Sequence, residues 1–214
     1  MSSTAVEHAH HDGPTDWPED AHYGKASAGK IGMWIFLLSD ALSFGGLLLA
    51  YAILRGGSKG PWVSPGEPEF GITFTAGLTF LLICSSVTMV LAHAAAVEGD
   101  RKKLVQFLAL TVLGGILFLT GQAQEYFGIF NGGHGLIEEG LKFGASARAS
   151  TFFVTTGFHG AHVLTGTIYL SIMTVRASMG KYDHGNHNSI EILGLFWHFV
   201  DLIWILVFTF IYLL

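Results

Sequence analysis

Charged residues and cysteine are scarce in this chain of 214 residues. Asp, Glu, Lys and Arg make up 13% of the sequence and hydrophobic residues 50%, a balance that excludes an ordinary soluble domain. The single cysteine, Cys84, excludes an intramolecular disulfide framework and a thiolate metal cluster. The net charge of −5 indicates no nucleic-acid partner. The first thirty residues lack the apolar stretch of a signal peptide, so we expect insertion through the first membrane helix.

Five apolar runs account for most of the chain beyond a polar, histidine-rich tail at residues 1–29. Each run is about 20 residues or longer, which is enough to cross about 30 Å of hydrocarbon. The sequence therefore predicts an all-α, polytopic membrane protein in which residues 30–214 form a bundle of five transmembrane helices. The predicted helices span residues 31–54, 72–97, 104–127, 150–176 and 190–214.

The distribution of lysine and arginine predicts the orientation of the bundle. With the N-terminus inside, seven of these residues lie on the inner side and four on the outer side, which favours N-in and C-out. The inner residues are Lys25, Lys30, Arg101, Lys102, Lys103, Arg176 and Lys181, and the outer ones are Arg55, Lys59, Lys142 and Arg148.

Several ionisable residues lie near the middle of the predicted helices. With a rise of about 1.5 Å per residue, all of them fall about 12–18 Å from the start of their helix. These residues, the predicted polar belt, are Asp40, His159, His162, His198 and Asp201. An ionisable group at that depth costs about 2.5–3.5 kcal/mol on insertion scales, so we expect these side chains to satisfy one another. We expect Asp40 and His159 to form the most consequential pair.

Three interpretations of this belt differ in chemistry. Polar contacts between membrane helices hold them together, and this is the interpretation that we favour. A proton relay or a metal or haem site is the sharper alternative, but a metal needs three or more ligands with outer-shell support. We therefore predict no metal site in this chain.

A second group of residues is predicted to contact lipid or a neighbouring subunit. Trp34 has the amphipathic ring that anchors helices at membrane interfaces. The polar cluster around Gln122, Glu125 and Tyr126 ends the third helix, where water or headgroups can reach it, and Trp197 precedes His198 in the last helix.

Glycines form a further pattern along the helices. Small residues let membrane helices approach closely, and we assign this packing role to a set of glycines. The set comprises Gly45, Gly46, Gly114, Gly115, Gly121, Gly157, Gly160 and Gly166.

Four short motifs lie in four of the five predicted helices. They are Trp34-Ile-Phe-Leu-Leu-Ser-Asp40 running on to Ala50-Tyr51, Gly121-Gln-Ala-Gln-Glu-Tyr126, Gly157-Phe-His-Gly-Ala-His-Val163 and Trp197-His-Phe-Val-Asp201. Together they resemble subunit III of the haem–copper cytochrome c oxidases, and the last two motifs, in that order and spacing, are highly specific. The longer family members have seven helices, whereas this chain has five. The usual Ser-Glu of the first motif is Ser39-Asp40 here, so the carboxylate has a shorter arm.

The resemblance implies an accessory membrane subunit without a cofactor of its own. It places haem and copper in partner subunits, where dioxygen reduction is coupled to cytochrome c oxidation and proton pumping. It also implies contact with subunit I, other oxidase subunits and phospholipid, membership of a larger respiratory supercomplex, and a location in the bacterial cytoplasmic membrane. Support of assembly, proton uptake and turnover stability would be its role.

Other functions stay open at the level of sequence. The equivalent subunit of a quinol oxidase or a nitric oxide reductase complex carries the same helices. A free-standing proton-coupled transporter and a membrane cytochrome with bis-histidine haem are alternatives from other classes. The absence of an internal repeat counts against the transporter.

Overall fold

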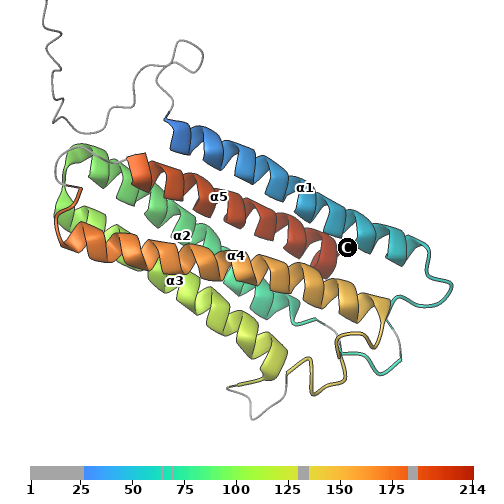
Figure 1. The fold of residues 1–214 in the computed structure, drawn as a ribbon. Helices are drawn as coiled ribbons and strands as arrows, with labels where there is room; N and C mark the ends of the chain where they lie inside the picture. Colours follow the sequence, from blue (N-terminus) through green and yellow to red (C-terminus); the bar gives the residue numbers. More distant parts are fainter. Residues whose placement is uncertain (1–26, 64, 69, 130–134, 183–187) are drawn as a thin grey trace, which may run out of the picture.

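The computed structural model describes residues 27–63, 65–68, 70–129, 135–182 and 188–214, and within them the chain forms helices and no strand. The helices are α1 (Ala28–Gly56), α2 (Ile72–Glu98), α3 (Arg101–Phe127), α4 (Ala147–Ser178) and α5 (Asn188–Phe208), and α5 continues as a π-helical turn, η1 (Thr209–Leu213). They lie side by side in one elongated bundle (Figure 1). The predicted all-α architecture of five helices is confirmed, while residues 1–26 of the predicted tail lie outside the described residues.

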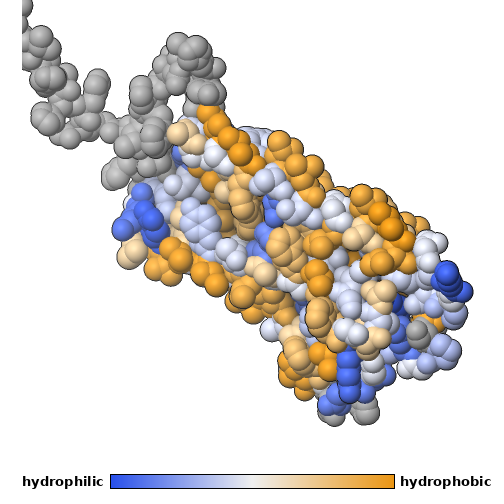
Figure 2. Space-filling view, turned by 45° about the vertical axis from the view of Figure 1, so that its right-hand side comes forward, coloured by the Kyte–Doolittle hydropathy of each residue, from blue (hydrophilic) through white to orange (hydrophobic). Residues whose placement is uncertain are grey.

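Four of these helices are long and apolar enough to cross a membrane: α1, α2, α3 and α5 together with η1. α4 is longer, at 32 residues, but it contains more polar residues. Four of them are buried inside the bundle: Thr155, Thr156, His159 and Thr167. Figure 2 shows hydrophobic residues along the visible side of the bundle and strongly hydrophilic residues mainly toward its ends. The chain is thus a polytopic membrane protein whose fourth helix turns polar side chains inward.

Short polar contacts fix how the helix ends meet. Gly99 adopts a left-handed conformation (φ 74°) at the end of α2, and the Asp100 side chain then accepts the backbone N–H of Lys103 to cap α3. This N–H bond, strengthened by the Lys103 side chain, lowers the pKa of Asp100. The two-residue turn makes α2 and α3 antiparallel neighbours.

The start of α1 lies beside the start of α5. Ser27 caps α1 by accepting from the backbone N–H of Lys30, and its hydroxyl also hydrogen-bonds to Asn188. Next to it, Lys30 Nζ lies 2.6 Å from Glu191 Oε1. Helices α1 and α5 therefore run parallel, with both N-termini at one end of the bundle.

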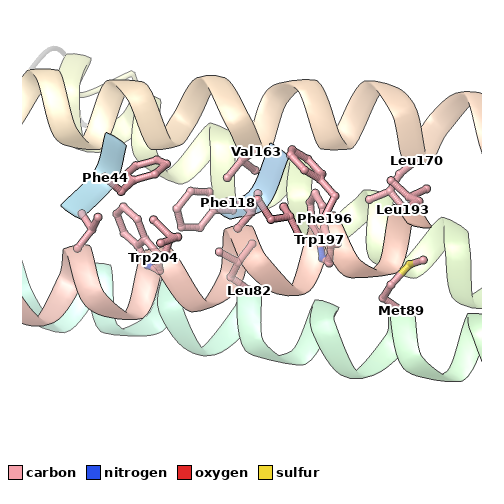
Figure 3. Close-up of a cluster of buried hydrophobic side chains, with 14 of the residues drawn as sticks. Phe44, Leu82, Met89, Phe118, Val163, Leu170, Leu193, Phe196, Trp197 and Trp204 are labelled. Atoms are coloured by element: carbon pink, nitrogen blue, oxygen red, sulfur yellow. The ribbon is translucent and has the colours of Figure 1, made fainter. Parts of the chain in front are cut away.

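Helix α5 forms the centre of the core. Trp204 contacts Phe118 of α3 with ring centroids 4.8 Å apart, and its indole N–H donates to Thr79 of α2 at 2.9 Å. One α-helical heptad earlier, the indole N–H of Trp197 donates to Ser85 at 3.1 Å. Figure 3 shows both tryptophans among side chains from all the neighbouring helices. Each buried indole thus brings a hydrogen-bond partner with it, as buried tryptophan requires.

Close approach between helices occurs at five of the eight predicted glycines. A Cβ atom added at Gly114 would lie 2.6 Å from Cβ of Ser85, so the glycine allows α2 and α3 to approach closely there. Gly115, Gly121, Gly160 and Gly166 are similarly crowded by side chains of other helices. Among the described residues, none has an atom within 4 Å of a Cβ added at Gly45, Gly46 or Gly157. At these three glycines the packing prediction is therefore wrong for contacts within this chain.

Candidate functional site

The first buried polar contact joins α1 to α4. Nε2 of His162 lies 3.2 Å from Oδ1 of Asp40, and both side chains are largely buried. The other ring nitrogen, Nδ1, is 2.8 Å from the carbonyl oxygen of Phe158. A carbonyl only accepts, so Nδ1 carries a hydrogen, and the contact with Asp40 requires a second one. This proton lies between Nε2 and Oδ1, which leaves the pair with no net charge at mid-membrane depth.

Aromatic rings surround this pair. The ring of Phe44 lies 5.4 Å from that of His162, and the ring of Phe158 lies 4.7 Å from it. Phe196 of α5 completes the set at 6.5 Å. These rings keep water away and strengthen the electrostatic interaction within the pair.

His159 is fully buried but does not pair with Asp40. Its ring packs against Trp204 at 4.7 Å and Phe118 at 5.7 Å. Neither ring nitrogen has a hydrogen-bond partner among the described residues. The predicted pair of Asp40 and His159 is therefore wrong: the rotation of α4 turns His162 toward α1 and His159 toward the core.

The second buried polar contact joins α2 to α5. Nδ1 of His198 lies 2.6 Å from Oγ of Ser86. The carboxyl group of Asp201, which is 6% exposed, interacts with the same Ser86 side chain, while its Oδ1 has no hydrogen-bond partner among the described residues. Ser86 therefore bridges the two residues of the Trp-His-Phe-Val-Asp motif. The predicted belt consists of two separate sets, Asp40 with His162 and His198 with Asp201, with His159 packed in the core.

The polar residues at the end of α3 contact other helices of this chain. Glu125 accepts hydrogen bonds from Thr75 of α2 at 3.1 Å and from Tyr212 of η1 at 2.9 Å. Gln122, which is 5% exposed, donates to the carbonyl of Thr156 at 2.8 Å. Three helices and the π-helical turn are tied together at this end.

Tyr126 belongs to the same network. Its hydroxyl lies 2.5 Å from the hydroxyl of Thr156 and accepts from Gln122 at 3.2 Å. The side chains of Gln122, Glu125 and Tyr126 thus have partners inside this chain. Trp197 is 1% exposed and Trp34 is 58% exposed, so of the two tryptophans only Trp34 presents its ring to the surroundings.

No group of three or more His, Cys, Asp or Glu side chains in the described ranges is arranged to hold a metal ion. The histidines that the sequence singled out instead contact Asp40, Ser86 and aromatic rings. This arrangement joins helices and can hold a proton between Asp40 and His162.

Comparison with known proteins identifies the family. A family model for cytochrome c oxidase subunit III matches residues 20–214. The chain is 36% identical to cytochrome c oxidase subunit 3 of Corynebacterium diphtheriae, over 86% of each chain. The chain belongs to the cytochrome c oxidase subunit III family. A second relative, cytochrome c oxidase subunit 3 of Synechocystis sp., is 34% identical over 100% of this chain and 88% of its own length.

Membership of the subunit III family confirms the resemblance carried by the four motifs. Family membership favours an oxidase subunit over the two alternatives from other classes, a proton-coupled transporter and a membrane cytochrome with bis-histidine haem. In this member of the family, the motif residues divide between inter-helix hydrogen bonds and the aromatic core.

An ion pair between the start of α4 and the loop that joins α1 to α2 escaped the sequence analysis. Arg148, at the start of α4, lies 3.1 Å from Glu67 and donates to the carbonyl of Pro68. Its guanidinium carbon lies 4.2 Å from the ring centroid of Phe70. The sequence analysis counted Arg148 only as an outer charge. Nothing in the sequence of that loop indicates a partner 81 positions away.

Proposed function

We propose that the chain is an accessory subunit, without a cofactor of its own, of a respiratory haem–copper terminal oxidase. Its catalytic partner would oxidise cytochrome c, reduce dioxygen and pump protons. Membership of the subunit III family supports this proposal. The observation that carries it is the division of the buried polar residues into separate inter-helix contacts. A catalytic or metal centre would need them to converge.

The contacts of the histidines support a role without haem or copper in this chain. Haem and metal ligation both use an imidazole nitrogen that is not otherwise engaged. His162 uses both ring nitrogens, one for Asp40 and one for the carbonyl of Phe158, so neither is open to a metal ion. The ring of His159 packs between those of Trp204 and Phe118, and neither of these side chains could ligate a metal ion together with it.

The proposed role is to keep the catalytic subunit assembled and active. Subunit I and the other oxidase subunits would be its protein partners in the bacterial cytoplasmic membrane, and phospholipid would cover its apolar surfaces. Docking within a larger respiratory supercomplex would use the same surfaces. Support of proton uptake and of stability during turnover would follow from a rigid bundle beside the catalytic subunit.

Asp40 is the residue whose loss tests this role. We expect Asp40→Ala to weaken docking or shorten the active life of the oxidase, because α1 loses its polar contact with α4. Haem content per catalytic subunit should stay unchanged. Glu138→Ala is the matched control, since Glu138 is an exposed carboxylate outside the helices.

The deciding experiment is purification of the tagged full-length chain in a mild detergent. We expect haem absorbance and an oxidase catalytic subunit to accompany it, with oxygen consumption driven by reduced cytochrome c. A tagged chain that purifies without any haem protein would overturn the proposal. Activity with a quinol but not with cytochrome c would assign the chain to a quinol oxidase instead.

A further inference from the structure

Helix α1 is attached to the bundle differently along its two halves. In the first half, Nζ of Lys30 lies 2.6 Å from Oε1 of Glu191 in α5. Near the middle, Asp40 pairs with His162 of α4. Beyond Asp40, no side chain of α1 forms a hydrogen bond or ion pair with another helix in the described ranges, and the Ser43 hydroxyl bonds to a carbonyl of α1 itself. The C-terminal half of α1 therefore has no polar contact of its own with α4 or α5.

Few apolar contacts hold this C-terminal half. Its buried side chains are those of Phe44, Leu48 and Tyr51. The ring of Phe44 packs against that of Phe158 in α4, with centroids 4.9 Å apart. Among the four helices that are long and apolar enough to cross a membrane, α1 is the least buried. A segment with few buried apolar contacts separates from its neighbours at a lower cost in free energy than a core helix does.

The loop that joins α1 to α2 supplies the polar attachment that the C-terminal half lacks. Trp62 of this loop packs edge-on against Tyr51 of α1, with ring centroids 5.4 Å apart. Five residues further on, Glu67 lies 3.1 Å from Arg148 at the start of α4, and the carbonyl of Pro68 accepts from the same guanidinium. The loop is thus in contact with α1 at one point and bonded to α4 at another.

Arg148 is a fixed anchor for the loop, because its side chain is buried in the bundle. It is 4% exposed, and its guanidinium carbon lies 4.2 Å from the ring centroid of Phe70. Phe70 in turn stacks on Phe152 of α4 at 4.5 Å and packs against Tyr212 of η1 at 5.0 Å. A buried charge that loses its partner is strongly destabilised, so Arg148 favours the arrangement in which the loop stays in place.

The position of α1 in the bundle lets it move without breaking the rest of the fold. α1 packs on α4 and α5, whereas α2 packs on α3 and α5. Helix α5 therefore separates α1 from α2, as Figure 1 shows. A displacement of α1 leaves the contacts of α2 with α3 and of α3 with α4 intact. In the part of the chain that the structure describes, the loop and Arg148 form the polar link between the C-terminal end of α1 and α4.

We propose that Arg148 is a latch for α1. While Arg148 holds Glu67 and the backbone next to it, the loop keeps the C-terminal half of α1 against α4. When these contacts break, α1 tilts about the pair of Asp40 and His162, and its C-terminal half separates from α4. Packed helices that move do so about a few fixed contacts, and this pair is the last polar contact before the free half begins. The latch is a property of this chain alone and does not depend on the proposed accessory role.

Distances between paired spin labels on the full-length chain in lipid nanodiscs test the latch, after Cys84→Ala has removed the native cysteine. One pair replaces Ile53 and Val154, near the C-terminal end of α1 and the start of α4. The other pair replaces Ile35 and Val175, near the opposite ends of the same two helices. All four side chains are exposed, so the labels leave the core unchanged. Position 53 lies about 20 Å beyond the proposed pivot along α1, so a small tilt moves it by several ångström.

Substitutions on both sides of the latch should change the first distance only. Arg148→Gln should raise the ratio of open to closed molecules about 10-fold to 100-fold, seen as a longer distance between positions 53 and 154. Glu67→Gln should act in the same direction but more weakly, because Arg148 keeps the carbonyl of Pro68. The matched controls are Lys142→Gln and Glu138→Gln, which remove exposed charges and should leave both distances unchanged.

Two outcomes would overturn the proposal. Distances between positions 53 and 154 that are the same in the wild type, Arg148→Gln and Glu67→Gln would refute the latch. Equal lengthening of both label pairs would show that α1 leaves as a whole and would refute the pivot. Circular dichroism identifies a variant that fails to fold, and Glu67→Gln, which keeps Arg148 and its other contacts, then carries the test. No partner subunit takes part, so either outcome leaves the proposed function as it stands.

Discussion

The proton held between Asp40 and His162 leads to a prediction about their energetic coupling. Across 3.2 Å, opposite unit charges attract by about 5 kcal/mol at an effective dielectric constant of about 20, and desolvation offsets part of this. Removal of one partner of such a buried pair costs about 3–5 kcal/mol, because it leaves the other side chain without its partner. Asp40→Ala and His162→Ala should each have an effect of this size. The double variant should lose about as much as either single variant, not the sum.

The assay is reversible unfolding of the full-length chain in mixed dodecyl maltoside and SDS micelles, followed by circular dichroism. Four proteins are compared: the wild type, the two single variants and the double variant. A double variant that loses the sum of the two single effects would refute the assigned pair. Asp40→Ala combined with Arg148→Lys provides the control, and its effects should add within about 0.5 kcal/mol because those two side chains share no partner.

Three further predictions concern packing and polar contacts elsewhere, each measured by the same unfolding assay. Gly114→Val should destabilise the bundle by about 1–3 kcal/mol, because its side chain would meet Ser85 across the contact of α2 and α3. Tyr212→Phe should cost about 1–3 kcal/mol, since Glu125 loses one of its two donors. Arg148→Lys should cost about 1–3 kcal/mol even though the charge is kept, because lysine lacks the planar fork that contacts a carboxylate, a carbonyl and an aromatic ring together.

Matched controls for these variants lie on the surface. Gly77→Val, Tyr169→Phe and Arg176→Lys make the same chemical changes at exposed positions. Each should change the free energy of unfolding by less than about 0.5 kcal/mol. Equal effects in a variant and its control would show that the contact assigned to the buried residue contributes nothing specific.

The helices could be predicted closely from the sequence because the membrane imposes their length. Runs of apolar residues interrupted by glycine, proline and charge leave little choice in where a helix begins or ends. The end of α2 illustrates this: Gly99 ends one helix and Asp100 caps the next, between the predicted spans 72–97 and 104–127. Even the polar α4 was found, because its length alone matched a membrane span.

The pairing of the polar residues was not predictable in the same way. His159 and His162 lie at similar depth and share a broad face of α4, so depth alone cannot tell which of them meets Asp40. Which histidine meets Asp40 depends on the rotation of α4 about its axis. The packing of Phe44, Phe158 and Trp204 determines that rotation. Sequence spacing carries no information about those contacts between helices.

The hydroxyl partners were missed for a different physical reason. Serine and threonine in a membrane helix can bond to a carbonyl of their own preceding turn, so their presence needs no outside partner. Ser86 and Thr75 turn out to contact His198 and Glu125. Nothing in their sequence context separates them from Ser43, which bonds only within its helix among the described residues.

The placement of α1 has a consequence for the order of events during synthesis. α1 is made first, yet the helices that it contacts are α4 and α5, and its first contact, Ser27 with Asn188, joins residues 161 positions apart. At about 5–20 residues per second, Asn188 emerges about 8–32 s after Ser27. His162 lies 122 residues after Asp40 and emerges about 6–24 s later, so Asp40 spends that time in the membrane without His162. The apolar residues of α1 must therefore hold it in the membrane by themselves until α4 and then α5 have been made.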